Sequence, residues 1–141
     1  MSQTPSILAL DIGKVRIGVA RAAWPNGIPT ALTTIANDTA LSANLNRLIT
    51  SQNAQLVVAG KPKTLSGTDS EQTRYTIKLI EKLEAAIGLK IYLQDESGTS
   101  LKAEAELKSN RRPYSREDID ALSAVFILED FLSDHPNGKG L

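Results

Sequence analysis

The chain has 141 residues, of which 41% are apolar and 23% are charged, and its formal net charge is zero. No apolar run approaches the roughly 20 residues that span a bilayer, and residues 1–5 lack the basic start of a secretory signal, so we expect one soluble, cytoplasmic domain without a membrane partner. The absence of cysteine and the single histidine exclude disulfides, thiolate zinc sites and Ser-His triads, which leaves carboxylates, hydroxyls, lysines and bound metal for any hydrolytic chemistry.

The first candidate for chemistry is an acid at the end of an apolar run. Residues 7–10 lead into Asp11, and Gly13 follows before a second apolar run at 17–20. This pattern predicts a strand, a tight turn and a strand, with Gly13 able to adopt a positive φ and to let a phosphate or hydrated metal approach the backbone. Asp11 is therefore a candidate metal ligand. The alternative is a turn residue that bonds its own backbone.

The amino-terminal part of the chain predicts three strands, at about 6–12, 15–23 and 28–36. Asn26-Gly27 lies between the second and third strands and is a strong hairpin signal, so the three strands should form an antiparallel meander. Trp24 stands at the tip of this hairpin. We expect it to pack over the hairpin or a neighbouring helix rather than to stack on an exposed base.

Helices and strands alternate after the meander. A helix capped by Asp38 has apolar residues at helical spacing over 41–49, and a short buried strand is predicted at 55–60. The next helix continues to Ile87 and ends at Gly88, a favourable residue for a helix carboxyl terminus.

Lys61 and Lys63 lie in the loop before that second helix. Thr68 and Glu71 have capping-box spacing, so the loop should lead directly to the helix amino terminus. Free backbone N–H groups, the positive end of the helix and the two lysines could together hold an anion, although the residue order is not that of a Walker loop. A solvent-exposed connection is the alternative.

A second strand that ends in acids is predicted at 90–94. It leads into Asp95-Glu96 and then into a helix at 101–107. One acid of this pair is a candidate functional residue. Helix capping and a favourable interaction with the helix dipole would also explain acids at this place.

Segment 108–116 is the densest positive stretch of the chain. Because the net charge is zero, a nucleic-acid partner would have to be held by a local basic patch of this kind. The segment suits phosphate contacts, and a solvated loop is the alternative. Its basic residues are Lys108, Arg111, Arg112 and Arg116.

The final predicted helix, 119–132, follows Ser115 and Asp118, which have capping-box spacing. Asp120 heads an apolar stripe on this helix and should point toward the protein body, where an unpaired carboxylate is costly. Residues 133–141 are predicted to form a flexible tail.

The order of the elements predicts a single α/β domain over 1–141, with an ordered core at about 6–132 and a mixed five-stranded sheet that carries helices on both faces. Asp11 and Glu96 fall at the carboxyl edge of the parallel strands, where such sheets bind ligands, and Asp120 begins the closing helix that could pack beside them. Three carboxylates suit Mg²⁺ or Mn²⁺, which can orient the attacking water and the leaving oxygen in phosphodiester hydrolysis.

Four motifs occur in order along the chain. They are Ile7-Leu8-Ala9-Leu10-Asp11-Ile12-Gly13 with Arg16-Ile17-Gly18-Val19-Ala20, then Gly60-Lys61-Pro62 with Gly67-Thr68 and Ser70-Glu71-Gln72, then Asp95-Glu96 with Thr99, and last Asp120-Ala121-Leu122-Ser123-Ala124. Together they resemble the YqgF family of RNase H-like proteins, described as Holliday-junction resolvases and as nucleases that mature the precursor of small-subunit ribosomal RNA. The resemblance implies an RNase H-like fold and, position by position, metal-binding acids at Asp11, Glu96 and Asp120.

Two departures from the family pattern concern the substrate. Ser97 and Ser100 stand where the family usually has Arg and Thr, and Lys14 and Val15 stand where it has Thr and Lys. The missing positive charge at Ser97 would weaken substrate binding, and the positive charge of Lys14 or Arg16 would partly compensate for this loss. Further candidates for contacts with the nucleic-acid backbone are Lys61, Lys63, Arg111, Arg112 and Arg116.

These features predict a metal-dependent endonuclease of structured nucleic acid, with the 5′ end of pre-16S rRNA as the expected substrate. Asp11 would anchor the metal, Glu96 and Asp120 would complete its ligands, and water would attack phosphorus.

Three alternatives remain at this stage. A resolvase of branched DNA would use the same chemistry as a symmetric pair, so the sequence leaves open a monomer or a homodimer. A catalytically weak RNA-binding factor of ribosome assembly would keep the fold, and ribosomal particles are a further candidate partner. Nucleotide binding, as in actin-like ATPases, would require a second such domain, for which the chain has no room.

Overall fold

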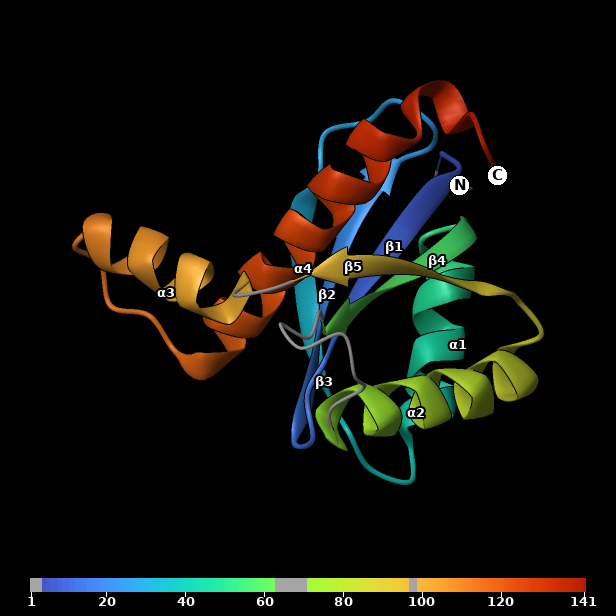
Figure 1. Ribbon diagram of the computed structural model, residues 1–141, viewed down its shortest axis with the longest axis horizontal. Helices are drawn as coiled ribbons and strands as arrows, with labels where there is room; N and C mark the ends of the chain where they lie inside the picture. The colour runs from blue at the N-terminus through green and yellow to red at the C-terminus, as the bar shows by residue number, and fades with distance from the viewer. Residues whose placement is uncertain (1–3, 63–70, 97–98) are drawn as a thin grey trace.

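One mixed sheet forms the centre of the computed structural model, which describes residues 4–62, 71–96 and 99–141 (Figure 1). Its strands are β1 (Ser6–Ile12), β2 (Arg16–Ala23), β3 (Thr30–Ala36), β4 (Ala54–Pro62) and β5 (Ile91–Glu96). The described strands lie in the order β3-β2-β1-β4-β5. β1 to β3 pair antiparallel, whereas β4 is parallel to β1 and to β5. The predicted meander and the mixed five-stranded sheet are confirmed.

Helices cover both faces of this sheet, as predicted (Figure 1). α1 (Leu41–Ser51) and α2 (Glu71–Ile87) lie on one face, and α4 (Arg116–Asp134) crosses the other. α3 (Thr99–Ser109) packs against α4 and projects away from the sheet, and a short 3-10 turn, η1 (Pro136–Gly138), follows α4. None of the described helices is long and apolar enough to cross a membrane.

Alternate residues of strand β1 pack in two different core layers, one on each face of the sheet. Leu8 and Leu10 belong to the core beneath α1 and α2, whereas Ile7 and Ala9 belong to the core beneath α4. Successive side chains of a strand point to opposite faces. Asp11, two residues beyond Ala9, therefore faces α4.

Strand β5 places a second acid on the same side of the sheet. Tyr92 packs in the core beneath α4, and Gln94 Nε2 donates a 3.0 Å hydrogen bond to Asp134 Oδ2 on that helix. Glu96 is the next residue in the alternation, so it also faces α4, at the carboxyl end of β5.

α4 begins as its sequence predicts. Ser115 is the N-cap residue, and its Oγ accepts a 3.3 Å hydrogen bond from the backbone N–H of Asp118. Asp118 Oδ2 in turn accepts a 2.9 Å hydrogen bond from the backbone N–H of Ser115. The predicted capping box is confirmed, and it gives two backbone donors a partner at the start of the helix.

The start of α1 differs from the prediction. Its N-cap residue is Ala40, not Asp38, and Ala40 makes no side-chain cap bond. Asp38 Oδ1 instead accepts a 2.9 Å hydrogen bond from the backbone N–H of Ala40, which is the bonding of a short turn ahead of the helix. The capping box expected at Thr68 lies outside the described residues.

The carboxyl terminus packs against the second hairpin. Trp24 lies against the core beneath α4, and Gly138 of η1 lies against the Trp24 ring, which confirms the predicted packing role. The rings of Phe131 and His135 are also in contact, with their centroids 4.6 Å apart. The predicted flexibility of residues 133–141 stays a prediction.

The first turns of α4 lie directly on the meander. A Cβ atom built on Gly18 would overlap the backbone of Asp120 and Ala121, so only glycine allows this close approach. On β3, Thr34 Oγ1 donates a 3.0 Å hydrogen bond to the carbonyl oxygen of Glu117. These two contacts determine where the amino-terminal end of α4 lies on the sheet.

Replacing Gly18 by alanine should lower the free energy of unfolding by about 3 kcal/mol, because the added methyl group would have to displace packed backbone rather than a flexible side chain. Urea denaturation measures this loss. Gly88→Ala is a matched control, since a Cβ atom there meets nothing within 4 Å and only the left-handed backbone, with φ of 71°, opposes it. That strain costs about 1 kcal/mol. Equal losses in the two variants would contradict the close contact at Gly18.

Candidate active site

Asp11 lies at the carboxyl end of β1, directly opposite Gly18 in the antiparallel pair with β2. Its side chain is half-buried. Burial, and secondly the negative charge of Asp120, raise the pKa of Asp11 from 3.8 to about 7. A buried acid whose charge is disfavoured by a neighbouring acid is a typical feature of cation-binding and catalytic sites.

Asp120 reaches the same place from α4. Its backbone lies on Gly18, the residue opposite Asp11, and its Oδ2 accepts a 2.7 Å hydrogen bond from Arg16 Nε. The side chains of Arg16 and Asp120 are 26% and 19% exposed, so water screens this ion pair only in part. Asp11, Arg16 and Asp120 are called the acid–arginine cluster below.

The turn from β1 to β2 closes tightly beside this cluster. The Gly13 N–H donates a 3.0 Å hydrogen bond to the carbonyl oxygen of Arg16, and a Cβ atom on Gly13 would lie 2.6 Å from that oxygen. The positive φ expected at Gly13 is not found: the described glycines with positive φ are Gly88, Gly138 and Gly140. The turn needs glycine for close approach rather than for a left-handed backbone.

Glu96 lies at the end of β5 with a different set of neighbours. The pKa of Glu96 is raised from 4.5 to about 8. Burial is the largest cause, and a hydrogen bond with Asp130 and the charges of Asp130 and Asp134 raise the pKa further. Lys102 acts in the opposite direction. Glu96 Oε1 is buried and has no hydrogen-bond partner among the described residues.

The structure brings Asp11 and Asp120 together and pairs Glu96 with Asp130 instead. Asp120 and Asp130 lie on the same helix, about 15 Å apart along its axis at 1.5 Å per residue. β4 lies between β1 and β5 in the sheet. Within the described ranges, no three Asp, Glu or His side chains are close enough to hold one metal ion. A ligand set made of all three predicted acids therefore stays a prediction.

The donor atoms suit a hard divalent cation. Asp11 and Asp120 contribute carboxylate oxygens, and the buried Oε1 of Glu96 lacks a partner among the described side chains. A buried carboxylate oxygen is costly unless a proton or a cation compensates its charge. Mg²⁺ and Mn²⁺ prefer such oxygen ligands, so these residues fit the predicted metals, with Asp11 and Asp120 as the candidate pair and Glu96 as the third candidate.

The predicted phosphate-binding residues lie in separate places. Lys14 is exposed at the turn between β1 and β2, and Lys61 is half-buried near the end of β4. Lys63 and Ser97 lie outside the described residues. The exposed basic residues at or just before the start of α4 are Arg111, Arg112 and Arg116.

Sequence reasoning missed two features of the site. Asp130 stands three residues after Ile127, on the flank of the apolar stripe that Asp120 heads, so helical periodicity could have indicated it. The bond between Arg16 and Asp120 left no such signal, because 104 positions of sequence separate the two residues.

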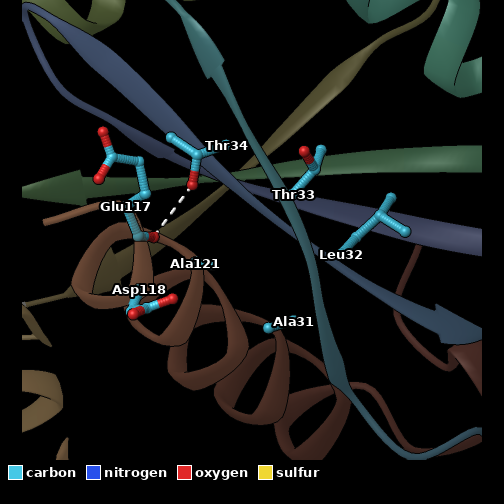
Figure 2. A pocket seen from close by; sticks show the side chains of 7 residues that line it. All are labelled: Ala31, Leu32, Thr33, Thr34, Glu117, Asp118 and Ala121. Atoms are coloured by element: carbon cyan, nitrogen blue, oxygen red, sulfur yellow. Dashed lines mark hydrogen bonds between the residues drawn. The ribbon is translucent and has the colours of Figure 1, made fainter. Parts of the chain in front are cut away.

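A shallow groove of about 370 Å³ lies beside this site, between β3 and the start of α4 (Figure 2). The hydrogen bond from Thr34 to the Glu117 carbonyl oxygen crosses it, and the carboxylate of Asp118 is already used in the capping box. No predicted catalytic acid lines the groove, so we place no chemistry there. Its lining residues are Ala31, Leu32, Thr33, Thr34, Glu117, Asp118 and Ala121.

The raised pKa values predict a pH-dependent stability of the metal-free protein. Between pH 4 and about 8 the folded state holds protons on Asp11 and Glu96 that the unfolded chain has lost. The free energy of unfolding should therefore fall as pH rises through this window. Urea denaturation in EDTA at pH 5, 6, 7 and 8 measures the decline.

Asp11→Asn is the decisive variant in this measurement, because asparagine resembles the protonated acid at every pH. We expect it to be more stable than the wild type at pH 5, to exceed the stability of the wild type by a larger margin at pH 8, and to show a shallower decline between the two. A variant that parallels the wild type over the whole range would show that Asp11 titrates normally.

Comparison with known proteins identifies the family and the fold. A family sequence model described as "RuvX: Holliday junction resolvase" matches residues 5–134. A relative from Sulfurihydrogenibium sp. (strain YO3AOP1), named "Putative pre-16S rRNA nuclease", is 42% identical over 129 residues, covering 89% of this chain and 88% of its own. A relative of the same name from Crocosphaera subtropica is 38% identical over 132 residues, covering 90% of this chain and 92% of its own.

Solved structures of resolvases share the fold. RuvC from Thermus thermophilus superposes with a TM-score of 0.54 at 9% identity, covering 92% of this chain and 96% of its own. The Holliday junction resolvase of fowlpox virus has a TM-score of 0.50 at 15% identity, covering 92% of this chain and 99% of its own. At these identities the likeness shows the fold alone, and it confirms the predicted RNase H-like architecture.

Proposed function

The chain belongs to the RuvX family of Holliday junction resolvases, which are nucleases, and we propose that this member is a metal-dependent endonuclease acting at the 5′ end of pre-16S rRNA. The observation that carries the proposal is the convergence of Asp11 and Asp120 at the carboxyl edge of the sheet. The RNA substrate is taken from the names of relatives that are 42% and 38% identical over most of the chain.

Each acid has a distinct part in this proposal. A divalent cation bound by the acids would supply the charge that activates water and stabilises the phosphate during hydrolysis. Asp11 is the anchor, because it ends a strand that is buried on both faces and is therefore rigid. Asp120 is held by Arg16 through Oδ2, which leaves Oδ1 as its candidate ligand atom. Glu96 is the third proposed ligand.

Arg16 acts in this scheme as a positioning residue. The sequence alone made it a candidate for substrate contact, but its Nε is 2.7 Å from Asp120 Oδ2. Its positive charge also balances one of the two acids of the acid–arginine cluster. Contact with the nucleic-acid backbone then falls to the basic residues without such a bond to the site, Lys14, Lys61, Arg111, Arg112 and Arg116.

Cleavage of branched DNA is the second candidate function, and the description of the family favours it. A junction has two equivalent strands to cut, so this function would require a symmetric pair of chains. Binding in ribosome assembly without cleavage is the third, with ribosomal particles as the partner. The grouping of Glu96 with Asp130, and the lack of a three-acid cluster among the described residues, favour it, because a nuclease needs its ligands together.

Asp11→Asn should reduce the cleavage rate about 1,000-fold or more, since loss of a metal ligand removes several kcal/mol of transition-state stabilisation. The assay offers a 5′-extended pre-16S RNA and a DNA four-way junction side by side, with Mg²⁺, Mn²⁺ or no metal. The preferred substrate decides between the first two functions. Binding of the RNA should survive in the variant.

Asp95→Asn is the matched control for this assay. It removes the same charge at the same edge of the sheet, but by strand alternation Asp95 points away from α4. It should cleave like the wild type. If neither substrate is cut by the wild type although the RNA binds tightly, the assembly function replaces the nuclease.

Arg16→Ala should lower kcat by about 100-fold with little change in KM. Without Arg16 the Asp120 carboxylate is no longer held in position, and a displacement of about an ångström impairs the alignment of the reacting groups but not the binding of the substrate. Arg116→Ala, at an exposed position proposed to contact phosphate, should do the reverse and raise KM. Steady-state kinetics on the preferred substrate separate the two. A rise in KM alone for Arg16→Ala would return Arg16 to the substrate-contact residues.

A further inference from the structure

A polar group of three residues lies on the other side of the β1–β2 turn from the acid–arginine cluster. Asn37 follows β3, Tyr75 lies in α2 and packs against the core on the α1–α2 face, and Lys14 is exposed in the turn itself. Asn37 Nδ2 is 2.7 Å from the carbonyl oxygen of Gly13 and 2.8 Å from the Tyr75 hydroxyl. No step of the proposed mechanism uses Asn37 or Tyr75.

The direction of these two hydrogen bonds follows from the atoms involved. A carbonyl oxygen can only accept, so the Asn37 atom facing Gly13 must be the amide nitrogen. The same nitrogen then donates its second hydrogen to the Tyr75 oxygen. The Tyr75 hydroxyl is therefore an acceptor in this bond, and its own hydrogen is left to donate elsewhere. No acceptor for it is found among the described residues.

This hydroxyl is held at a defined position. The backbone N–H of Asn37 donates a 3.0 Å hydrogen bond to the carbonyl oxygen of Val15, which extends the β2–β3 pairing into the turn. At the start of α2, Thr73 Oγ1 donates a 3.2 Å hydrogen bond to the carbonyl oxygen of Pro62 at the end of β4. Both ties hold Tyr75 at the carboxyl edge of the sheet, where a donor of fixed position binds a ligand at low entropic cost.

Lys14 adds a positive charge to the free donor. Its Nζ lies 5.8 Å from the centroid of the Tyr75 ring, within the range of a cation–π contact, so the ring keeps the ammonium group near the hydroxyl. The adjacent acid, Asp38, accepts a hydrogen bond from the backbone N–H of Ala40 through Oδ1. A cation beside a neutral donor suits an anion with several acceptor oxygens, such as a phosphate group.

We propose that the Tyr75 hydroxyl and the Lys14 ammonium group bind one phosphodiester of the substrate strand, near the phosphodiester that is cut at Asp11 and Asp120. The identity of the strand rests on the proposed function, whereas the pairing of donor and cation does not. The two sites lie on opposite faces of the sheet and share the β1–β2 turn, so a strand that crosses this edge meets both. Tyr75 is thus a substrate-binding residue, and Asn37 positions it.

The test measures equilibrium binding in EDTA, so that no cleavage occurs, to a labelled 5′-extended pre-16S RNA and to a DNA four-way junction at several KCl concentrations. Tyr75→Phe removes only the hydroxyl and should weaken binding about tenfold at every salt concentration, as expected for a hydrogen bond to a charged group. Lys14→Ala should also weaken binding and reduce the salt dependence by about one phosphate contact. The double variant should lose less than the product of the two single losses, because both groups hold one phosphate.

Tyr92→Phe is the matched control. Lys90 Nζ lies 4.6 Å from the Tyr92 ring, so the pair has the same chemistry, but it stands at the amino end of β5, away from the proposed sites. It should bind like the wild type. Thermal unfolding of each variant identifies any loss of folded protein.

The outcomes separate the inference from the proposed function. Affinity of Tyr75→Phe equal to that of Tyr92→Phe overturns the inference, and a lowered melting temperature with unchanged affinity does so too, because it assigns the hydroxyl a purely structural role. Absence of binding to both probes also overturns it. A tenfold loss in Tyr75→Phe supports the inference even if the wild type cuts neither probe, in which case only the nuclease proposal fails.

Discussion

The contact between the start of α4 and strand β2 governs the arrangement of the charged residues. Gly18 lets the backbone of Asp120 lie on the strand, and Arg16 Nε then holds the Asp120 carboxylate at 2.7 Å. Because Gly18 pairs with Asp11, the same contact places two acids of distant sequence side by side. The contact also sets the path of α4 across the sheet. The carboxyl end of α4 meets β5, where Gln94 donates a hydrogen bond to Asp134.

This arrangement leaves the site short of positive charge. Arg16 pairs with one of the two acids of the acid–arginine cluster, and Glu96 lies near Asp130 and Asp134, with Lys102 opposing their effect on its pKa. Burial makes that imbalance costly, so protons remain on Asp11 and Glu96 up to pH values of about 7 and 8. A divalent cation would relieve the same imbalance, which is the physical link between the pKa values and the proposed metal dependence.

The turn between β1 and β2 joins the two faces of the sheet. On one side it carries the acid–arginine cluster, and on the other it carries Lys14 beside the Tyr75 hydroxyl. Asn37 ties the turn to α2 through the Gly13 carbonyl oxygen and Tyr75. A rigid edge of this kind suits a polymeric substrate, because successive phosphates can be held on both faces without rearrangement of the protein.

The sequence by itself determined the elements, their order and the mixed sheet, because hydrophobic periodicity and the capping box at Ser115 act over a few neighbouring residues. It also identified Asp11, Glu96 and Asp120 as candidate acids. Only the tertiary structure decided which of them meet: Asp120 pairs with Arg16 across 104 positions, and Glu96 lies with Asp130. Asn37, distant in sequence, likewise donates to the Tyr75 oxygen, which leaves the hydroxyl hydrogen without an acceptor among the described residues. Such contacts depend on how a helix crosses a sheet, and no local pattern of residues records that crossing.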